Sequence, residues 1–361
     1  MSRAGKIFFI CVYSLVAIGI VMTYSASAIY AEKVYRDPQY LLIRQSIYAL
    51  AGTVLLFMTA SIPAGFWQKN ARGLVLSAVL FLGLVFIPGI GHLAGGAQRW
   101  IGLGMINFQP AEFAKLTVCI YLSDYLARKA KDIKKGSLLV FIPPLLIMGT
   151  MSALLLMQPD LGSCAFICLI TGILFFLAGF RLSYVGAGLA VALPVFYFLV
   201  MRTPYRLSRV TAYMNPWDDP QGSGFQMIQS LLAFGLGGVQ GVGLGQSTQK
   251  LFYLPSGYND FIFSITAEEL GLVGVLVILG LYFCIFLSGM TIAARAENDF
   301  KRLCVSSLTL MIVFQALVNM MVATGLIPTK GLPLPFLSYG GTSLVINLIG
   351  TGLLLSLDRS G

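Results

Sequence analysis

Apolar stretches of about twenty residues alternate with short polar segments along most of the chain. A helix needs roughly twenty apolar residues to cross the hydrocarbon core of a bilayer. The pattern therefore predicts an all-α polytopic membrane protein with about ten transmembrane helices. The predicted spans cover residues 7–29, 45–64, 73–91, 110–127, 138–157, 162–180, 184–201, 261–290, 303–326 and 337–357.

One polar segment, residues 202–260, is much longer than the others and lies between the seventh and eighth predicted spans. It is rich in Gly, Pro, Gln and Asn, which predicts loops and short helices lying on the membrane surface. Loops of this length are usually functional. We therefore expect residues 1–361 to form a single membrane domain with one large extracytoplasmic loop.

The composition supports this class of protein. Hydrophobic residues make up 57% of the chain and charged residues only 11%, and a soluble domain carries roughly twice that charged fraction. The first apolar run, from Ile7 to Ile29, is too long for the core of a signal peptide, so we interpret it as a retained span. No sizeable soluble domain is expected.

The net charge of +10 follows from topology. Lys and Arg collect in cytoplasmic loops, and the dense cluster at residues 128–135 lies in a short loop. With that loop inside, both termini are cytoplasmic and residues 202–260 face outward. The positive charge therefore gives no reason to expect a nucleic-acid partner.

Cysteine and histidine offer little chemistry. The chain has one histidine, His92. It therefore lacks the histidines of a histidine-rich metal site and offers a single candidate base for serine–histidine hydrolysis. The cysteines lie in or beside apolar runs, without the spacing of a metal site, and are expected to be small hydrophobic side chains in helices. They are Cys11, Cys119, Cys164, Cys168, Cys284 and Cys304.

Asp260 is the strongest candidate for a catalytic residue. It stands where the long polar segment meets the eighth span, and a carboxylate there is costly unless it is paired or functional. A partly apolar boundary raises the pKa of a carboxyl toward that of a general base at neutral pH. The alternative is that Asp260 caps the following helix, a role that is compatible with catalysis. Glu268 and Glu269 lie two turns further on, so at least one must face the bundle interior.

Charged residues in and beside other spans are candidates for substrate binding. Glu112 and Lys115 are three apart on one helix face, which predicts either a structural ion pair or one wall of a polar cavity. Asp160 lies at the outer end of the fifth span. Arg99 stands beside Trp100 in the second outer loop.

The outer loop itself supplies cations and flexible backbone. Arg202, Arg206 and Arg209 have helical spacing just above the bilayer, where they would either hold a pyrophosphate or extend toward lipid head groups. Alternating glycines at 241–245 predict a flexible or closely packed backbone, and not a nucleotide fingerprint. Ser338, in a Pro/Gly-rich segment, indicates tight packing or contact with a head group, and the alternative is that it belongs to an ordinary loop.

Six motifs follow one another between residues 98 and 343. They are QRWIGLG, FQPAEFAKL, QPDLGS, NPWDDPQGSGFQMIQSLLAFGLGGVQGVGLGQSTQKLFYLP, NDFIFSITAEELGLVG and PFLSYGGTS. In these motifs and in their order the chain resembles the SEDS family (shape, elongation, division and sporulation), and the predicted spans agree along the full length.

The resemblance implies a peptidoglycan glycosyltransferase in the bacterial cytoplasmic membrane. Its substrate would be lipid II, which an inverting transfer polymerises through β-1,4 links with release of undecaprenyl pyrophosphate. Asp260 matches the family's essential aspartate, and Glu112, Lys115 and Asp160 match polar residues around its cavity. The loop sequence favours the division or sporulation branch over the elongation branch.

The resemblance also implies partners, namely a class B penicillin-binding protein and other divisome membrane proteins. No cofactor is required by the reaction, although the charge on the leaving group could be met by a divalent cation instead of Arg202, Arg206 or Arg209. Two other functions remain open from sequence. One is a lipid II flippase, and the other is a non-catalytic scaffold that recruits the transpeptidase.

Overall fold

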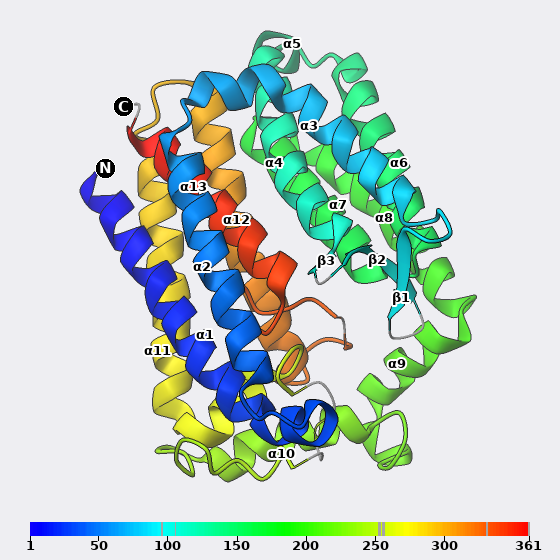
Figure 1. Cartoon of the computed structure of the whole chain (residues 1–361). Helices are drawn as coiled ribbons and strands as arrows, with labels where there is room; N and C mark the ends of the chain where they lie inside the picture. Colours follow the sequence, from blue (N-terminus) through cyan, green and yellow to red (C-terminus); the bar gives the residue numbers. More distant parts are fainter. Residues whose placement is uncertain (95–96, 105, 252–253, 255–256, 330, 360–361) are drawn as a thin grey trace.

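A computed structural model describes residues 1–94, 97–104, 106–251, 254, 257–329 and 331–359. These residues are predominantly helical, as Figure 1 shows. The helices are α1 (Arg3–Tyr35), α2 (Tyr40–Ser61), α3 (Ala64–Leu84), α4 (Pro110–Arg128), α5 (Ala130–Lys134), η1 (Leu138–Phe141), α6 (Ile142–Met157), α7 (Leu161–Leu177), α8 (Leu182–Met201), α9 (Pro204–Met214), η2 (Pro216–Asp218), α10 (Phe225–Gly237), α11 (Ile262–Ala294), α12 (Asp299–Ala323) and α13 (Gly341–Arg359).

Each predicted span overlaps a helix of the structure, but the helices differ in their fitness to cross a membrane. Six described segments are long and apolar enough: α1, α2, η1 with α6, α11, α12 and α13. Helix α7 has 17 residues, and α4 carries the acidic Glu112 in its first turn and the basic Arg128 in its last turn. The structure therefore supports a multi-pass membrane protein, whereas the count of about ten spans stays a prediction.

A small antiparallel sheet corrects the all-α expectation. Strands β1 (Gly91–Ala94), β2 (Ala97–Leu103) and β3 (Ile106–Phe108) lie in the order β1-β2-β3 between α3 and α4. They are too short and too irregular in sequence to show the alternation that identifies a strand. Thr342 of α13 donates to the carbonyl of Asn107 at 2.8 Å, so the sheet joins the starts of α4 and α13.

Helices α4, α12 and α13 form the centre of the bundle. Most of their residues are buried, which is expected of a helix surrounded by other helices. Around them, α2 packs on α13, α3 packs on α4, and α11 packs on both α1 and α12. The centre therefore brings together three segments that lie far apart in the sequence.

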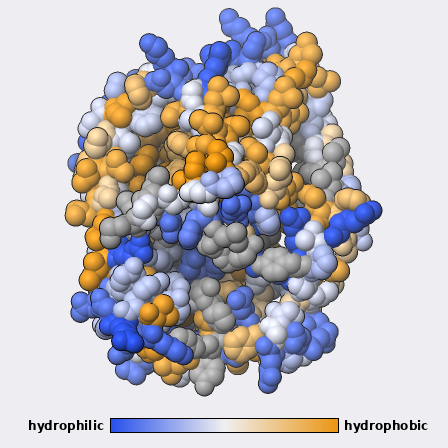
Figure 2. Space-filling model, turned by 45° about the vertical axis from the view of Figure 1, so that its right-hand side comes forward, coloured by the Kyte–Doolittle hydropathy of each residue, from blue (hydrophilic) through white to orange (hydrophobic). Residues whose placement is uncertain are grey.

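The two ends of the bundle differ in character. Both termini and α5 lie at one end (Figure 1), where the backbone N–H of Ser2 donates to the Asp358 carboxylate at 2.7 Å. The sheet, α9 and α10 lie toward the opposite end. Figure 2 shows hydrophobic residues gathered between hydrophilic ends, with a recessed hydrophilic area in the lower half.

Helix α11 is kinked at Gly271, which has φ 65° and ψ −165°. The glycine-rich stretch after α10 packs its backbone directly onto this kink. Val242 N–H donates to the carbonyl of Glu268 at 2.9 Å, and Leu272 N–H donates to that of Gly238 at 3.0 Å. Of the two alternatives for the glycines at 241–245, close backbone packing is the one found at Gly241 and Gly243.

We predict that Gly271→Ala lowers the stability of the fold. A Cβ at this position would lie 2.3 Å from the backbone nitrogen of Gly241, and the positive φ disfavours any L side chain. This combination of φ and ψ is essentially restricted to glycine, and a side chain there costs about 1–3 kcal/mol. Thermal unfolding in detergent should show a clearly lower Tm.

Gly280→Ala is the matched control, because it lies in the same helix and a Cβ there has no neighbour within 4 Å. It should leave the Tm unchanged or raise it slightly. Equal unfolding temperatures for the two variants would contradict the role of the Gly271 kink.

Candidate active site around Asp260

Asp260 lies in a turn just before α11, and hydrogen bonds from other segments hold the backbone of this turn. Asn319 of α12 donates through Nδ2 to the carbonyl of Asp260 at 2.9 Å and to that of Leu332 at 2.9 Å. The Asp260 carboxylate faces Gly331, where a Cβ would lie 3.6 Å from Oδ2. Helix α11 begins after Phe261 with no side-chain cap, so the alternative that Asp260 caps this helix is wrong.

The electrostatic surroundings favour a base of moderate strength. Burial raises the pKa of the Asp260 carboxyl to about 6, although the positive charges of Arg209 and Arg99 lower it. Because the pKa stays below 7, the carboxylate is mostly ionised at neutral pH and can accept a proton. Two predicted cations thus act on the predicted base.

Ser338 acts on the backbone beside Asp260. Its hydroxyl donates to the carbonyl of Asn259 at 2.7 Å and accepts from the backbone N–H of Leu334 at 2.8 Å. The backbone N–H of Tyr339 adds a bond to the carbonyl of Tyr258 at 3.1 Å. The segment 331–339 therefore holds the Asp260 turn in place, and the Ser338 hydroxyl is occupied by these bonds.

Glu112 and Lys115 connect to the same segment through α12. The Lys115 ammonium bonds Glu112 Oε1 at 2.8 Å and Gln315 Oε1 at 2.7 Å. Both members of the ion pair have only 2% of their side chain exposed. Gln315 then donates through Nε2 to the carbonyl of Pro333 at 2.9 Å. The network runs from α4 through α12 to the segment that surrounds Asp260.

Arg99 of β2 bonds the link between α6 and α7, which ends at Asp160. Asp160 caps α7, accepting from the backbone N–H of Ser163 at 3.1 Å and from its hydroxyl at 2.8 Å. Arg99 donates to the carbonyls of Gln158 at 3.2 Å and Pro159 at 2.6 Å. These bonds hold the Arg99 charge close enough to affect Asp260.

The three arginines of the outer segment have different surroundings. Arg202 follows α8, and its guanidinium lies 4.6 Å from the ring centroid of Phe198. Arg206 donates to the carbonyl of Leu199 at 3.1 Å. Arg209, further along α9, donates to the carbonyl of Thr329 at 3.2 Å and acts on the pKa of Asp260. The structure therefore associates Arg209 with Asp260 more directly than the other two.

Glu268 and Glu269 are both buried, and they anchor the loop before Asp260. Glu268 accepts from the backbone N–H of Thr248 at 2.8 Å and from its hydroxyl at 2.9 Å. Glu269 accepts from Ser25 at 2.7 Å and pairs with Lys250 at 3.2 Å. The prediction that at least one faces the interior is confirmed. The hydrogen bonds of Glu268 and Glu269 hold the loop that precedes Asp260, so their role is to position that loop.

Asn319 and Gln315 were not among the predicted site residues. The available signal was their type, since an amide within an otherwise apolar span is costly unless it is hydrogen-bonded. Sequence does not show which carbonyl each amide would reach. Among the described residues, no three His, Cys, Asp or Glu side chains gather in a way that could hold a metal ion.

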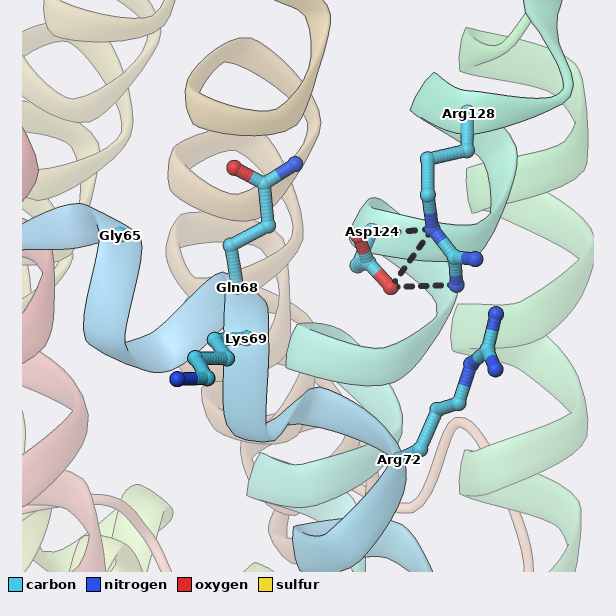
Figure 3. A pocket seen from close by; sticks show the side chains of 6 residues that line it. All are labelled: Gly65, Gln68, Lys69, Arg72, Asp124 and Arg128. Atoms are coloured by element: carbon cyan, nitrogen blue, oxygen red, sulfur yellow. Dashed lines mark hydrogen bonds and ion pairs between the residues drawn. The ribbon is translucent and has the colours of Figure 1, made fainter.

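A cavity of about 420 Å³ lies at the other end of the bundle, between α3 and α4. Figure 3 shows its lining, in which the Arg128 guanidinium holds the Asp124 carboxylate with contacts of 2.6–3.0 Å. Lys69 and Arg72 add further positive charge. It holds none of the predicted site residues, and its one carboxylate is already paired, so we place the candidate active site at Asp260.

A sequence model of the FtsW/RodA/SpoVE family, described as "Cell cycle protein", matches residues 5–361. The chain therefore belongs to this family, which confirms the resemblance seen in the motifs. Within it, the chain is 43% identical over 358 residues to the "Probable peptidoglycan glycosyltransferase FtsW" of Geobacter sulfurreducens, covering 99% of this chain and 96% of that one. It is 40% identical to the stage V sporulation protein E of Bacillus subtilis, covering 96% and 94%.

Solved structures share the fold. A chain from a structure described as "Structural coordination of polymerization and crosslinking by a peptidoglycan synthase complex" is similar with a TM-score of 0.79 and 31% identity, covering 98% of this chain and 97% of that one. The rod shape determining protein RodA of Thermus thermophilus gives a TM-score of 0.72 at 28% identity, covering 98% and 96%.

We predict that Lys115→Met destabilises the protein by about 3–5 kcal/mol, because it leaves the Glu112 carboxylate buried without its partner. Thermal unfolding in detergent measures the loss. The double variant Lys115→Met/Glu112→Leu removes both charges and should recover much of the lost stability. A single variant as stable as the original chain would show that the pair contributes nothing to the fold.

Proposed function

We propose that this protein is a peptidoglycan glycosyltransferase that polymerises lipid II during division or sporulation. The observation that carries the proposal is the Asp260 carboxylate, with a pKa of about 6, under the influence of Arg99 and Arg209. Such a site combines a base with cations suited to a phosphate leaving group. The names of the similar proteins support the same class of enzyme.

The proposed reaction is a single displacement. The Asp260 carboxylate accepts the proton of the acceptor's sugar 4-hydroxyl as the oxygen forms a bond to the anomeric carbon of the donor. The bond from that carbon to the pyrophosphate oxygen breaks, and undecaprenyl pyrophosphate leaves with the electron pair. Inversion turns an α-linked donor into a β-1,4 product and needs no carboxylate nucleophile. Arg99 and Arg209 stabilise the departing charge.

The proposed topology places this chemistry on the outer face of the bacterial cytoplasmic membrane. About ten helices cross the bilayer, and both termini lie inside. The charged residues of α3, α4 and α5 at the terminal end support this orientation. Residues 202–260, with α9, η2 and α10, then form the outer segment of a single membrane domain.

We further propose that the enzyme works with a class B penicillin-binding protein and other divisome membrane proteins. The support is the likeness to a chain of a peptidoglycan synthase complex whose description couples polymerisation to crosslinking. A lipid II flippase and a non-catalytic scaffold are the rival functions. Neither needs a base at the position of Asp260.

Asp260→Asn should abolish polymer formation, because the amide keeps the shape of the side chain but cannot accept the proton. Loss of a general base typically costs about 10²–10⁴-fold in rate. The measurement is glycan chain formation from lipid II by the purified protein with its penicillin-binding partner. Asp219→Asn is the matched control, because Asp219 is a carboxylate of the same segment whose bonds go to neighbouring residues of its own turn, Gly222 and Ser223.

Near-normal glycan chains from folded, partner-bound Asp260→Asn would refute the assignment. Movement of labelled lipid II between leaflets without polymer, by the original chain, would favour a flippase instead. Full division function with a neutral residue 260 would favour a scaffold. Loss of polymer on chelation, restored by Mg²⁺, would assign the leaving-group charge to a divalent cation.

The rate of polymerisation should fall on the acid side with a midpoint near pH 6, as Asp260 becomes protonated. Arg209→Gln removes a charge that lowers this pKa, so its acid midpoint should shift to higher pH. Arg202→Gln is the control, because the charges that lower the pKa of Asp260 are those of Arg209 and Arg99. Identical acid midpoints of the rate in Arg209→Gln and Arg202→Gln would show that the Arg209 charge does not act on the pKa of Asp260.

A further inference from the structure

A groove of about 340 Å³ runs along the bundle surface between the first turns of α1 and the last turns of α11. Ala4 and Ile7 line it from α1, and Cys284, Leu287 and Ser288 line it from α11. Its size falls within the range of small-molecule sites, about 300–1,000 Å³. It lies at the end of the bundle that holds the termini, far along α11 from Asp260 (Figure 1).

The walls of the groove are almost entirely apolar. Two hydroxyl side chains of α11 border it, but both are turned back onto their own helix. Ser288 donates to the carbonyl of Cys284 at 2.6 Å, and Thr291 donates to that of Leu287 at 2.7 Å. Since these hydroxyls are satisfied locally, the groove offers a surface for a hydrocarbon chain and not for a sugar or peptide backbone.

Two arginines close the groove at the end of the bundle. Arg3 begins α1 and Arg295 follows α11, and both side chains are exposed. Nearby acids are engaged elsewhere. Asp358 accepts from the backbone N–H of Ser2 at 2.7 Å. Glu297 pairs with Lys301 at 2.6 Å, and Asp299 pairs with Arg302 at 2.9 Å. Within the described part of the chain, neither arginine has an ion pair of its own.

We propose that this groove binds one anionic glycerophospholipid of the inner leaflet. Arg3 and Arg295 hold the phosphodiester through charge-assisted bonds, and an acyl chain lies against Ile7 and Leu287. Both walls belong to helices long and apolar enough to cross a membrane, so the groove leads from the interface into the hydrocarbon layer. This site is separate from Asp260 and goes beyond the proposed polymerisation.

The charge of the groove distinguishes a lipid from a partner's transmembrane helix. The cytoplasmic end of a spanning helix carries excess Lys and Arg, which would meet two arginines here. Like charges at that contact are unfavourable. An anionic head group has the complementary charge, and its acyl chain matches the apolar walls.

Native mass spectrometry of the purified full chain tests the proposal without any polymerisation readout. The probes are phosphatidylglycerol and phosphatidylcholine with the same acyl chains. Phosphatidylglycerol should bind in one copy, and Arg3→Gln/Arg295→Gln should weaken that binding about tenfold or more. Lys134→Gln/Lys135→Gln removes the same charge from exposed positions at the same end and should bind like the original chain.

Photo-crosslinking locates the lipid. A phosphatidylglycerol with a photoreactive acyl chain should label peptides containing residues 3–7 and 284–291, also when the penicillin-binding partner is present. Equal binding of both lipids, or unchanged binding by Arg3→Gln/Arg295→Gln with an unaltered Tm, would overturn the proposal. Displacement by an equal concentration of inorganic phosphate, or labelling of the partner's helix in place of 284–291, would do the same.

Discussion

An ammonium group buried among helices must find its acceptors within the protein, since no bulk water reaches it. Lys115 meets this constraint with Glu112 on its own helix and with Gln315 on α12. The second bond fixes the approach of α4 to α12. Because Gln315 also bonds the carbonyl of Pro333, the same constraint extends to the segment that faces Asp260.

The position of Asp260 depends on hydrogen bonds to the backbone of its turn more than on contacts of its own side chain. Asn319 and Ser338 bond carbonyls in and beside the turn, while Gly331 leaves the carboxylate room. This arrangement is suited to a base, because the carboxylate oxygens are not consumed by the bonds that hold the turn. Burial and the arginine charges then act on its pKa in opposite directions.

The two ends of the bundle use charge in different ways. Toward the Asp260 end, Glu268 and Glu269 bind the loop that precedes the site. Their carboxylates accept hydrogen bonds from the backbone of this loop and pair with Lys250. At the terminal end, basic residues predominate, and Arg3 and Arg295 have no acidic partner among the described residues. The proposed active site and the proposed lipid groove therefore share no residues.

Sequence by itself determined the class of protein, because apolar run length and the Lys/Arg distribution respond to the bilayer and not to tertiary detail. It also marked Asp260, Glu112 and Lys115 as candidates, since charged residues in or beside apolar spans are costly unless they are paired or functional. Sequence did not predict the short strands between α3 and α4, whose pairing is too brief to leave a periodic signal.

Only the tertiary structure decided which residues meet. It brought the charges of Arg209 and Arg99 within electrostatic range of Asp260, and it assigned Asn319 and Gln315 to particular carbonyl groups. A hydrogen bond between segments distant in sequence depends on the packing angles of several helices at once, and no local pattern records those angles. The sequence therefore specified which groups need partners, and the packing of α4, α11 and α12 selected those partners.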